Sequence, residues 1–315
     1  MDLPMRGSLL PAALRYADQV ARSGSVQRAS KELNVAASAV IRQIALLEEN
    51  IGTALFERVP RGMRLTPAGD ALIALVRRWK ADERRVVTEI QQLQGVNQGH
   101  VRLAVMDSHV NGFLPGFIAD LAVSHPRISL DITVASPDDV IQSLAAGQAD
   151  LAAVFNLPPR RDLHILWSAE LPFGCVVAPD HDLARRGSTS LQEAVAYPIV
   201  LQSRALVIRR FLDARYDWVL EGSRKLVETN SLQLVKQLAR SGQYIAFTSE
   251  LDAAPELEAG ELVFLPVRDK AAEPQSVSVA INASAPFSRV TRIVADGLTT
   301  AVQRALENAR AVGTP

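Results

Sequence analysis

The sequence has a single cysteine and no long hydrophobic run. Cys175 is the only cysteine among 315 residues, which excludes an internal disulfide and any metal site built from several cysteines. We interpret Cys175 as a small core residue rather than a catalytic thiol. No stretch reaches about 18 uninterrupted apolar residues, so no membrane-spanning segment is expected. The first residues contain no basic flank leading into an apolar core, and we therefore expect a cytoplasmic protein.

Enzyme motifs are also missing. The chain has no Gly-rich phosphate loop, no Gly-x-Ser-x-Gly elbow and no His-Glu-x-x-His pair. Asp107, Ser108 and His109 have the residue types of a nucleophilic triad, but triads assemble from distant segments rather than from neighbours on one turn. We therefore expect a protein that is not an enzyme, with no catalytic residues, no bound metal and no cofactor.

Charge is balanced over the whole chain but not along it. Lys and Arg number 34, Asp and Glu also number 34, and the hydrophobic share of 48% is typical of globular proteins. Residues 1–99 contain 14 basic and 10 acidic residues, whereas residues 100–315 contain 20 and 24. A basic N-terminal part followed by an acidic remainder indicates two regions with different tasks.

The N-terminal part has the spacing of three helices. Apolar residues recur at helical spacing over residues 10–20, and Gly24 is suited to end this helix in a left-handed conformation. Ser25 can cap a second helix over residues 26–33. After a tight turn, we expect a third helix over residues 36–50.

The second and third helices have the geometry of a helix-turn-helix, because Ala29 and Ser30 are small enough to let them approach closely. In such a motif the outer side of the third helix faces base edges in the major groove. The residues expected on this side are Ala36, Ala37, Ser38, Ile41 and Arg42. Arg42 can pair with guanine or a phosphate, and Ile41 can contact a thymine methyl group.

A basic hairpin is expected after the third helix. The pattern in residues 55–65 predicts two short extended segments around a Pro–Gly turn. Arg58, Arg61 and Arg64 would form a compact cationic loop suited to phosphates or to the minor groove. Each arginine alone is better explained as ordinary solvated surface. Three of them on one module with Arg42 favour double-stranded DNA as the partner.

A long helix is expected over residues 67–94, because Thr66 can cap it and Pro67 suits its first position. Apolar residues recur on one face with a seven-residue period, which is typical of a dimer contact. The residues of this expected dimer contact are Leu72, Val76, Trp79, Val86, Ile90 and Leu93. The alternative is that this face packs on the protein's own body. Polar, glycine-containing residues 95–99 predict a hinge.

The rest of the chain alternates strands and helices. The order β-α-β-α-β over residues 101–155 predicts a parallel sheet with helices on both faces. The same rhythm resumes over residues 174–248, and two late strands precede a final helix over residues 289–310. We therefore expect two similar α/β lobes within residues 100–315. Lobe I would comprise about 100–168 and 270–305, and lobe II about 169–269.

Polar residues follow the ends of several expected strands in both lobes. In parallel α/β sheets, ligands bind beyond the carboxyl ends of strands, where helix N-termini present free N–H groups. The residues expected to bind an effector in a cleft between the lobes are Ser108, His109, Ser136, Gln202, Ser203, Asn230, Phe247 and Thr248. Each hydroxyl could alternatively be only a helix cap. Because helix N-termini favour anions, we expect a small carboxylate.

A long ordered signature in residues 12–69 resembles the winged helix-turn-helix of LysR-type transcriptional regulators. The matching runs are Ser23 to Val35, Ala39 to Ile44, Leu47-Glu48, Gly52, Leu55 to Arg58 and Leu65 to Gly69. The remaining chain resembles the effector domain of the same family, which is similar in shape to periplasmic solute-binding proteins. In this family Ser108, Ser136, Gln202 and Thr248, or their neighbours, correspond to effector contacts.

The resemblance implies an α+β multidomain protein. Residues 1–66 would form a winged helix-turn-helix, residues 67–94 a linker helix, and residues 100–315 a two-lobed α/β effector domain. It also implies a sequence-specific transcriptional regulator that binds operator or promoter DNA and responds to a small-molecule effector. Such a regulator would form a homodimer or homotetramer and act on RNA polymerase.

The third helix departs from the family pattern. The family often has Ser-Gln-Pro where this chain has Ala36-Ala37-Ser38, and serine where it has Ile41. Loss of the serine cap costs the helix about 1 kcal/mol, and loss of the glutamine removes a group that reads adenine. Two other functions stay open from the sequence. One is an α/β solute-binding module whose head serves only dimerisation, and the other is an architectural DNA-binding protein without an effector.

We expect Arg42→Ala to abolish selective operator binding, because Arg42 lies on the base-reading side of the third helix. Arg61→Ala should instead weaken binding to all DNA about equally and lower its salt dependence, because a hairpin arginine contacts phosphates. Gel shifts with operator and unrelated DNA at several salt concentrations measure both effects. Unchanged selectivity in Arg42→Ala would contradict the role given to the third helix.

Overall fold

The computed structural model consists of two compact units. Nearly all of the first unit lies before Gly99, and nearly all of the second unit begins at Gly99 and continues to the end of the chain. We call them the head and the body. The structure describes residues 8–60, 62–93, 99–203, 207–215, 225–269, 272–285 and 287–312. No helix among these described residues is both long enough and apolar enough to cross a membrane.

Three helices open the head: α1 (Ala12–Ser23), α2 (Val26–Leu33) and α3 (Ala37–Ile51). Gly24 ends α1 with a φ of 63°, a left-handed conformation that costs glycine little. The side chain of Ser25 then accepts a hydrogen bond from the Arg28 N–H and starts α2. These two adjacent signals turn the chain sharply and produce the expected helix-turn-helix.

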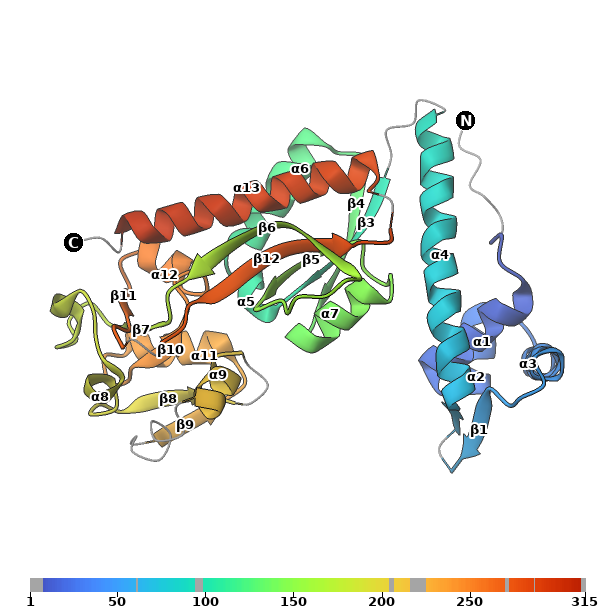
Figure 1. The fold of residues 1–315 in the computed structure, drawn as a ribbon, viewed down its shortest axis with the longest axis horizontal. Coiled ribbons are helices and arrows are strands. Elements are labelled where there is room, and N and C mark those ends of the chain that lie inside the picture. The colour runs from blue at the N-terminus through green and yellow to red at the C-terminus, as the bar shows by residue number, and fades with distance from the viewer. Residues whose placement is uncertain are drawn as a thin grey trace. The chain divides into compact units, whose positions relative to one another are not determined.

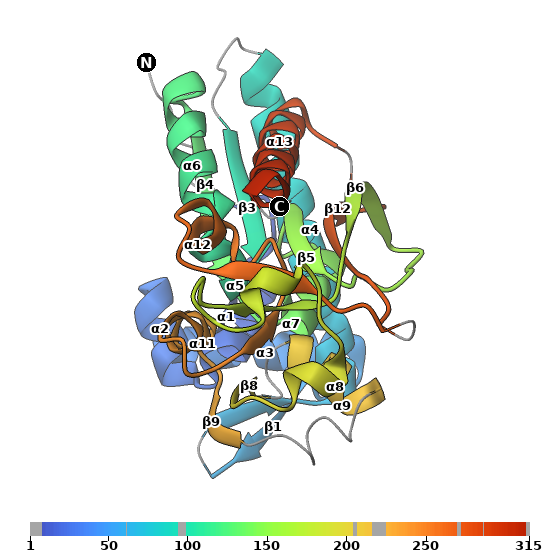
Figure 2. The ribbon, with the colours of Figure 1, turned by 90° about the vertical axis from the view of Figure 1, so that its left-hand side faces the viewer.

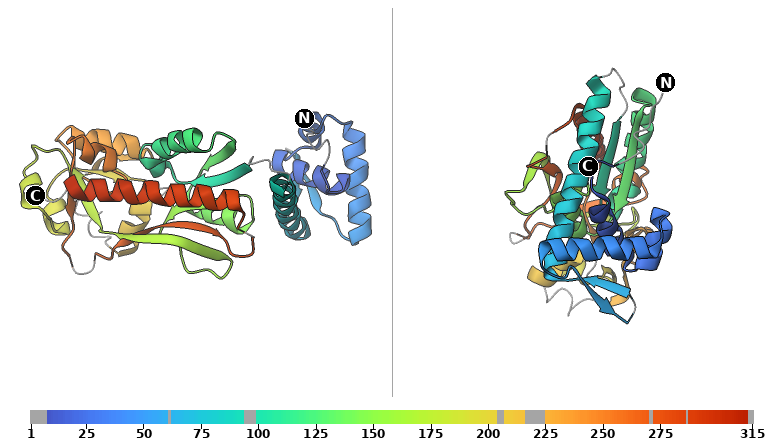
Figure 3. Two further views of the ribbon diagram at one scale, coloured as in Figure 1. Left: turned by 90° about the horizontal axis from the view of Figure 1, so that it is seen from above. Right: turned by 90° about the vertical axis from the view of Figure 1, so that its right-hand side faces the viewer.

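A hairpin and a long helix complete the head. Strand β1 (Phe56–Val59) pairs antiparallel with β2 (Gly62–Leu65). The hydroxyl of Thr66 accepts a hydrogen bond from the Gly69 N–H at 3.1 Å and caps α4 (Pro67–Leu93). Figure 1 shows α1, α2 and the hairpin gathered at one end of α4, and the right-hand view of Figure 3 shows the same grouping.

The first turns of α4 pack within the head itself. Val76 is fully buried in the head core, and Leu72 packs against the edge of that core. Asp18 of α1 is also buried, and its carboxylate accepts hydrogen bonds from Arg77 at 3.2 Å and Lys80 at 2.5 Å. This end of α4 is therefore fixed to α1 by apolar burial and by two ion pairs.

The expected dimer contact must be corrected at Val76, because none of its surface remains for a partner chain. The seven-residue period selects one face of the helix, and the first turns of that face already cover α1. Farther along α4, Trp79, Val86 and Ile90 are 42%, 40% and 48% exposed. The side chain of Leu93 lies outside the described residues.

Lobe I of the body is built on a five-stranded mixed sheet in the order β4-β3-β5-β12-β6. The strands are β3 (Gly99–Val105), β4 (Ile128–Val134), β5 (Leu151–Phe155), β6 (Leu163–Leu171) and β12 (Gln275–Asn282). As expected, β3 pairs parallel with β4 and with β5, whereas β12 is antiparallel to its neighbours β5 and β6. The carboxyl ends of β3, β4 and β5 therefore lie at one edge of the sheet.

Helices cover this sheet and join it to lobe II. They are α5 (Asp107–Val110), α6 (Phe113–Ser124), α7 (Pro137–Ala145) and α13 (Arg289–Val312). Figure 1 shows α6 and α13 above the sheet and α7 below it, and the left view of Figure 3 shows α13 along the body. Helix α13 contacts α6 of lobe I and α12 of lobe II. Of the expected hinge, residues 95–98 lie outside the described residues, and Gly99 begins β3.

Lobe II differs from the expected repeat of a parallel sheet. Strand β7 (Gly174–Val177) lies between β10 (Ala246–Thr248) and β11 (Val263–Pro266), antiparallel to both, and β8 (Ile199–Gln202) pairs parallel with β9 (Lys225–Thr229). The helices are α8 (Leu191–Ala194), α9 (Val207–Arg215), α11 (Leu232–Arg240) and α12 (Ala254–Glu258), with a short 3-10 turn η1 (Ala184–Arg186). Figure 2 shows β8 and β9 beside α8 and α9. The alternation of strands and helices along the sequence predicts where strands lie but not whether they pair parallel or antiparallel. This explains why the antiparallel pairing of β7 was not expected.

A buried ion pair stabilises lobe II. The Nζ of Lys236 on α11 lies 2.7 Å from an oxygen of Glu256 on α12 and donates to the Asp252 carbonyl at 3.1 Å. Lys236 is only 1% exposed. On the same helix, Arg240 forms a pair of similar length, 2.9 Å, with Glu261, but these two side chains are 34% and 39% exposed.

We expect Lys236→Met to lower the free energy of unfolding of the body by about 3–5 kcal/mol, because Glu256 would keep a buried charge without its partner. Arg240→Met is the matched control, since it removes a cation from the same helix. It should cost at most about 1 kcal/mol, because solvent screens the exposed pair. Urea unfolding followed by circular dichroism measures both. Equal losses would show that burial does not decide the strength of these pairs.

Candidate functional site

The outer side of α3 forms a small exposed surface at the start of the helix. Ala36 precedes α3 and makes no side-chain cap, as its chemistry predicts. Ser38 and Arg42 are exposed, and Ile41 is 50% exposed, while Ala37 is half-buried. Val40 and Ile44 point inward and are buried. The five residues expected to contact DNA therefore share a face with solvent access, and their contacts with bases stay a prediction.

The hairpin arginines differ in their surroundings. Arg58 is exposed on β1. Arg64 on β2 is also exposed, but its guanidinium lies 2.7 Å from the Glu57 carboxylate across the hairpin. Arg61 lies outside the described residues. Contact between Arg64 and a phosphate would compete with Glu57, so Arg58 is the less encumbered of the two described arginines.

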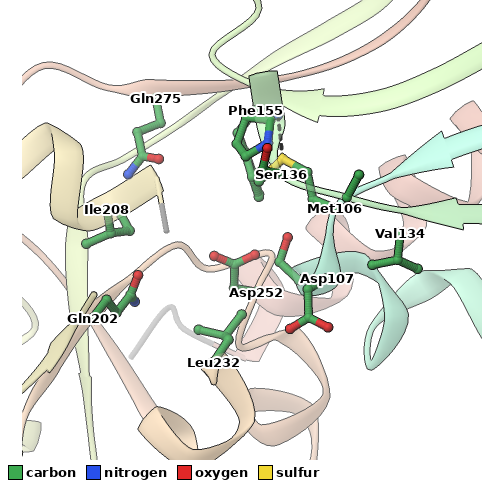
Figure 4. Close-up of a pocket in the computed structure, with 13 residues that line it drawn as sticks. Met106, Asp107, Val134, Ser136, Phe155, Gln202, Ile208, Leu232, Asp252 and Gln275 are labelled. Carbon is green, nitrogen blue, oxygen red and sulfur yellow. Dashed lines mark hydrogen bonds between the residues drawn. The ribbon is translucent and has the colours of Figure 1, made fainter. Parts of the chain in front are cut away.

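A cavity of about 280 Å³ lies in the body at the carboxyl ends of the parallel strands. Lobe I contributes residues after β3, at and after the end of β4, at the end of β5 and at the start of β12. Lobe II contributes residues from β8, α9, α11 and the segment after β10 (Figure 4). The described residues that line it are Met106, Asp107, Ser108, Val134, Ala135, Ser136, Pro137, Phe155, Gln202, Ile208, Leu232, Asp252 and Gln275. Its walls are mostly apolar with a few polar groups, as in many small-molecule sites.

Ser108, Ser136 and Gln202 line the cavity, as the sequence predicts. The side chain of Gln202 is fixed there, because its Nε2 donates to the Phe247 carbonyl at 2.7 Å. Ser136 caps α7, and its hydroxyl donates to Asp139 at 2.6 Å.

The other five expected effector residues do not line the cavity. They are His109, Ser203, Asn230, Phe247 and Thr248. The ring of Phe247 stacks on Phe173 in the lobe II core, and the hydroxyl of Thr248 donates to Asp252 at 3.2 Å. Asn230 is exposed. A residue that follows a strand lies near the cavity, but successive side chains of an extended segment point to opposite sides. About every second side chain therefore points away from the cavity.

His109 is a core residue rather than a titrating ligand contact. It is 1% exposed, and its ring centroid lies 5.1 Å from that of Phe113 and 5.3 Å from that of Phe155. Burial lowers the pKa of His109 to about 3, because the charged imidazolium is poorly solvated there. The ring is therefore neutral near pH 7.

Sequence reasoning missed Asp252 and Gln275, which are 7% and 3% exposed. Asp252 follows β10 by four residues and could have been found as a polar residue after a strand. Gln275 begins β12, which runs antiparallel to β5, so its N-terminal end lies at the carboxyl end of β5. Nothing in the sequence showed this direction.

The described lining of the cavity has acidic but no basic side chains, and the expected carboxylate ligand stays a prediction. The ionisable residues among the described lining are Asp107 and Asp252, both acidic. Burial raises the pKa of Asp252, because its carboxylate charge is poorly solvated. The helix N-termini that motivated an anion already carry acids, since Asp107 lies in the first turn of α5 and Asp138 and Asp139 in that of α7.

Metal and thiol chemistry find no support at the described residues. They contain no group of three His, Cys, Asp or Glu side chains that could hold a metal ion. Cys175 is buried in the lobe II core, and burial raises its pKa to about 12, which keeps it a thiol near pH 7.

A helix-turn-helix head and a two-lobed α/β body around a cavity together define a DNA-binding regulator with a ligand-binding domain. A model of the LysR substrate binding domain matches residues 94–303, and a model of the bacterial regulatory helix-turn-helix protein, lysR family, matches residues 11–70. The chain therefore belongs to the LysR family of transcriptional regulators.

Known relatives support this assignment. The RuBisCO operon transcriptional regulator of Allochromatium vinosum is 30% identical over 255 residues, which cover 81% of this chain and 84% of the relative. A full-length OxyR variant from Pseudomonas aeruginosa has the same fold, with a TM-score of 0.66 at 20% identity over 91% of this chain and 93% of that one. Full-length CbnR in complex with its target DNA has a TM-score of 0.58 at 19% identity, covering 93% and 98%.

We expect His109 to make the body sensitive to acid. Its pKa in the folded state, about 3, lies below the ordinary value of 6.5, so stability is complete above pH 6.5 and is lost as the pH falls toward 3. His109→Phe should flatten this loss by up to about 1.4 kcal/mol per pH unit. Urea unfolding at pH 7 and pH 5 measures it. Phe113→Leu changes the same ring cluster without a titrating group and should keep the original pH slope.

Proposed function

We propose that the chain is a sequence-specific regulator whose DNA binding and bending are controlled by a small molecule bound in the body cavity. One observation supports the control by a ligand. The cavity is lined from both lobes and contains buried polar atoms, on Ser108, Asp252 and Gln275, that form no hydrogen bond of ordinary geometry with the described residues, although Ser108 lies near enough to lower the pKa of Asp252 against the larger effect of burial. Buried polar groups ordinarily have partners, so these atoms are suited to contact a ligand.

A ligand in this position would bridge the two lobes. It would favour the arrangement of lobes that it contacts best and shift their equilibrium toward that arrangement. Helix α13 touches both α6 and α12, and Arg310 near its end lies 2.7 Å from Glu250 in the segment that also contains Asp252. A displacement of Asp252 by a ligand would therefore be transmitted through Glu250 and Arg310 to α13, the helix that contacts both lobes.

Pairing of two chains would convert this change into altered DNA binding. Trp79, Val86 and Ile90 leave an exposed apolar stripe on α4, which is suited to pair with a second copy. Two paired heads would recognise an inverted repeat in operator or promoter DNA, and their separation would set the bend. A homodimer or homotetramer, with RNA polymerase as a further partner, completes the proposal. CbnR, solved with its target DNA, shares this fold.

We expect Ala135→Trp to abolish the response of the DNA footprint to small molecules, because the indole would occupy the cavity that Ala135 lines. Val123→Trp is the matched control, since Val123 is 85% exposed on α6 and does not line the cavity. Footprints of the chain's own upstream DNA, with and without a protein-free small-molecule filtrate of the host cells, measure the response. Affinity for DNA without filtrate should stay within about threefold in both variants.

The same footprints distinguish the alternatives. A head that serves only dimerisation would give no footprint at all. An architectural DNA-binding protein would give a footprint that ignores the filtrate. A response that survives in Ala135→Trp would contradict the placement of the ligand in this cavity.

A further inference from the structure

We propose that the ligand of the cavity is a small organic amine whose protonated nitrogen donates to the carboxylate of Asp252 and whose apolar body fills the rest of the space. This inference rests on the proposed function, since it specifies the ligand of the same cavity. It replaces the carboxylate expected from the sequence. Three independent features of the described residues support it: the orientation of the free polar atoms, the state of the nearby cations, and the apolar walls.

Asp252 lines the cavity and its carboxylate is almost fully buried. Its Oδ2 accepts the hydroxyl of Thr248 at 3.2 Å, and its backbone N–H donates to Ser249 at 3.1 Å, so the residue is held in place. Its Oδ1 is buried and forms no hydrogen bond of ordinary geometry with the described residues, although the neighbouring Ser108 hydroxyl lowers the pKa of Asp252 against the larger opposing effect of burial. Figure 4 shows the carboxylate near the middle of the lining side chains. A buried carboxylate of this kind favours a ligand that can donate a hydrogen bond.

Gln202 adds a second acceptor. Its Nε2 is committed to the Phe247 carbonyl, which can only accept a hydrogen bond, so the amide orientation is fixed. The Oε1 atom is then the part of the amide left for a ligand, and Figure 4 shows it on the cavity side. Gln275 supplies the opposite chemistry, because its buried Nε2 has no partner among the described residues. The polar lining therefore calls for a ligand with donors and one acceptor.

The nearest buried cations are already neutralised. Lys236 lies close enough to influence Asp252, but its ammonium group is paired with Glu256 at 2.7 Å. Arg209 donates to the Gln202 carbonyl at 3.3 Å, and its guanidinium is held by Asp213 at 2.8 Å and Glu228 at 3.2 Å. Neither cation is free to balance a ligand carboxylate. The uncompensated charge at the described lining is negative, and a cation from the ligand would balance it.

The apolar side chains of the cavity indicate the chemistry of the rest of the ligand. Met106, Leu232, Ile208 and Phe155 give the cavity an apolar lining from both lobes. A metal ion or a fully hydrated cation would leave these walls without a partner. An amine attached to a hydrocarbon body satisfies both the carboxylate and the walls.

The test compares three probes of nearly equal shape and different charge: benzylamine, benzyl alcohol and benzoate. Their binding to the full-length protein at pH 7 is measured by calorimetry or ligand-observed NMR at millimolar concentration, which suits ligands of this size. We expect benzylamine to bind at least about tenfold more tightly than benzoate, because a buried charge-assisted hydrogen bond has this strength. Benzyl alcohol should lie between them. Binding should be lost in Ala135→Trp and kept in Val123→Trp.

Asp252→Asn tests the named oxygen. The amide keeps the size of the carboxylate, so benzylamine binding should fall about tenfold or more while benzyl alcohol binding changes less than about twofold. Glu258→Gln, at the exposed end of α12, is the matched control and should change neither. Asp107→Asn should have a smaller effect than Asp252→Asn, since Asp107 is exposed and solvent screens its charge.

Two outcomes would overturn the inference. Tighter binding of benzoate, lost in Ala135→Trp, would show an anion site and leave the proposed function in place. Absence of benzylamine binding in the wild-type protein, or equal benzylamine binding in Asp252→Asn, would reject the amine. The proposed function fails on a different observation, namely a DNA footprint that does not respond to the small-molecule filtrate.

Discussion

The parallel pairing of β3 with β4 and β5 is the constraint on which the cavity of the body depends. In register, Val105 at the end of β3 lies opposite Val134 of β4 and Ala153 of β5, so the segments that follow these strands emerge together at one edge. Five consecutive residues of β5 are buried, which fixes this strand in the middle of the core. Met106, Ser108 and Ser136 reach the cavity because the sheet brings their loops there. Lobe II closes the space with residues from four other segments.

The charge of the cavity depends on which ionisable side chains of the body are buried and paired, rather than on the net charge of the chain. The chain as a whole is neutral, yet the described lining of the cavity is acidic. The buried cations Lys236 and Arg209 are used to balance Glu256, Asp213 and Glu228. Ion pairs of this kind remove charge from the space available to a ligand. Helix N-termini around the cavity are similarly offset by their own first-turn acids. The electrostatic character of the cavity is therefore set by Asp252, a buried carboxylate whose neighbouring cation, Lys236, is paired with Glu256.

One helix of the head, α4, has a buried first part and an exposed apolar second part. The first turns of α4 pack on α1, where Asp18 pairs with Arg77 and Lys80, and this makes the helix a fixed part of the head. Its later turns expose large apolar side chains that a single chain does not cover. A surface of this kind on a rigid helix favours association, because apolar area is removed from water without reorganising the head. The exposed side of α3 is held by the same small core, through Val40 and Ile44.

The sequence by itself determined the local elements and the family. Gly24, Ser25 and Thr66 act on neighbouring backbone groups, so their effects on helix ends could be predicted without tertiary contacts. Tertiary structure decided which residues meet. Strand direction in lobe II, the burial of Val76 and His109, and the arrival of Asp252 and Gln275 at the cavity all depend on contacts between distant segments. Periodicity records which face of an element is apolar, but the partner that covers this face, and hence the charge left uncompensated beside it, is fixed only when the chain has folded.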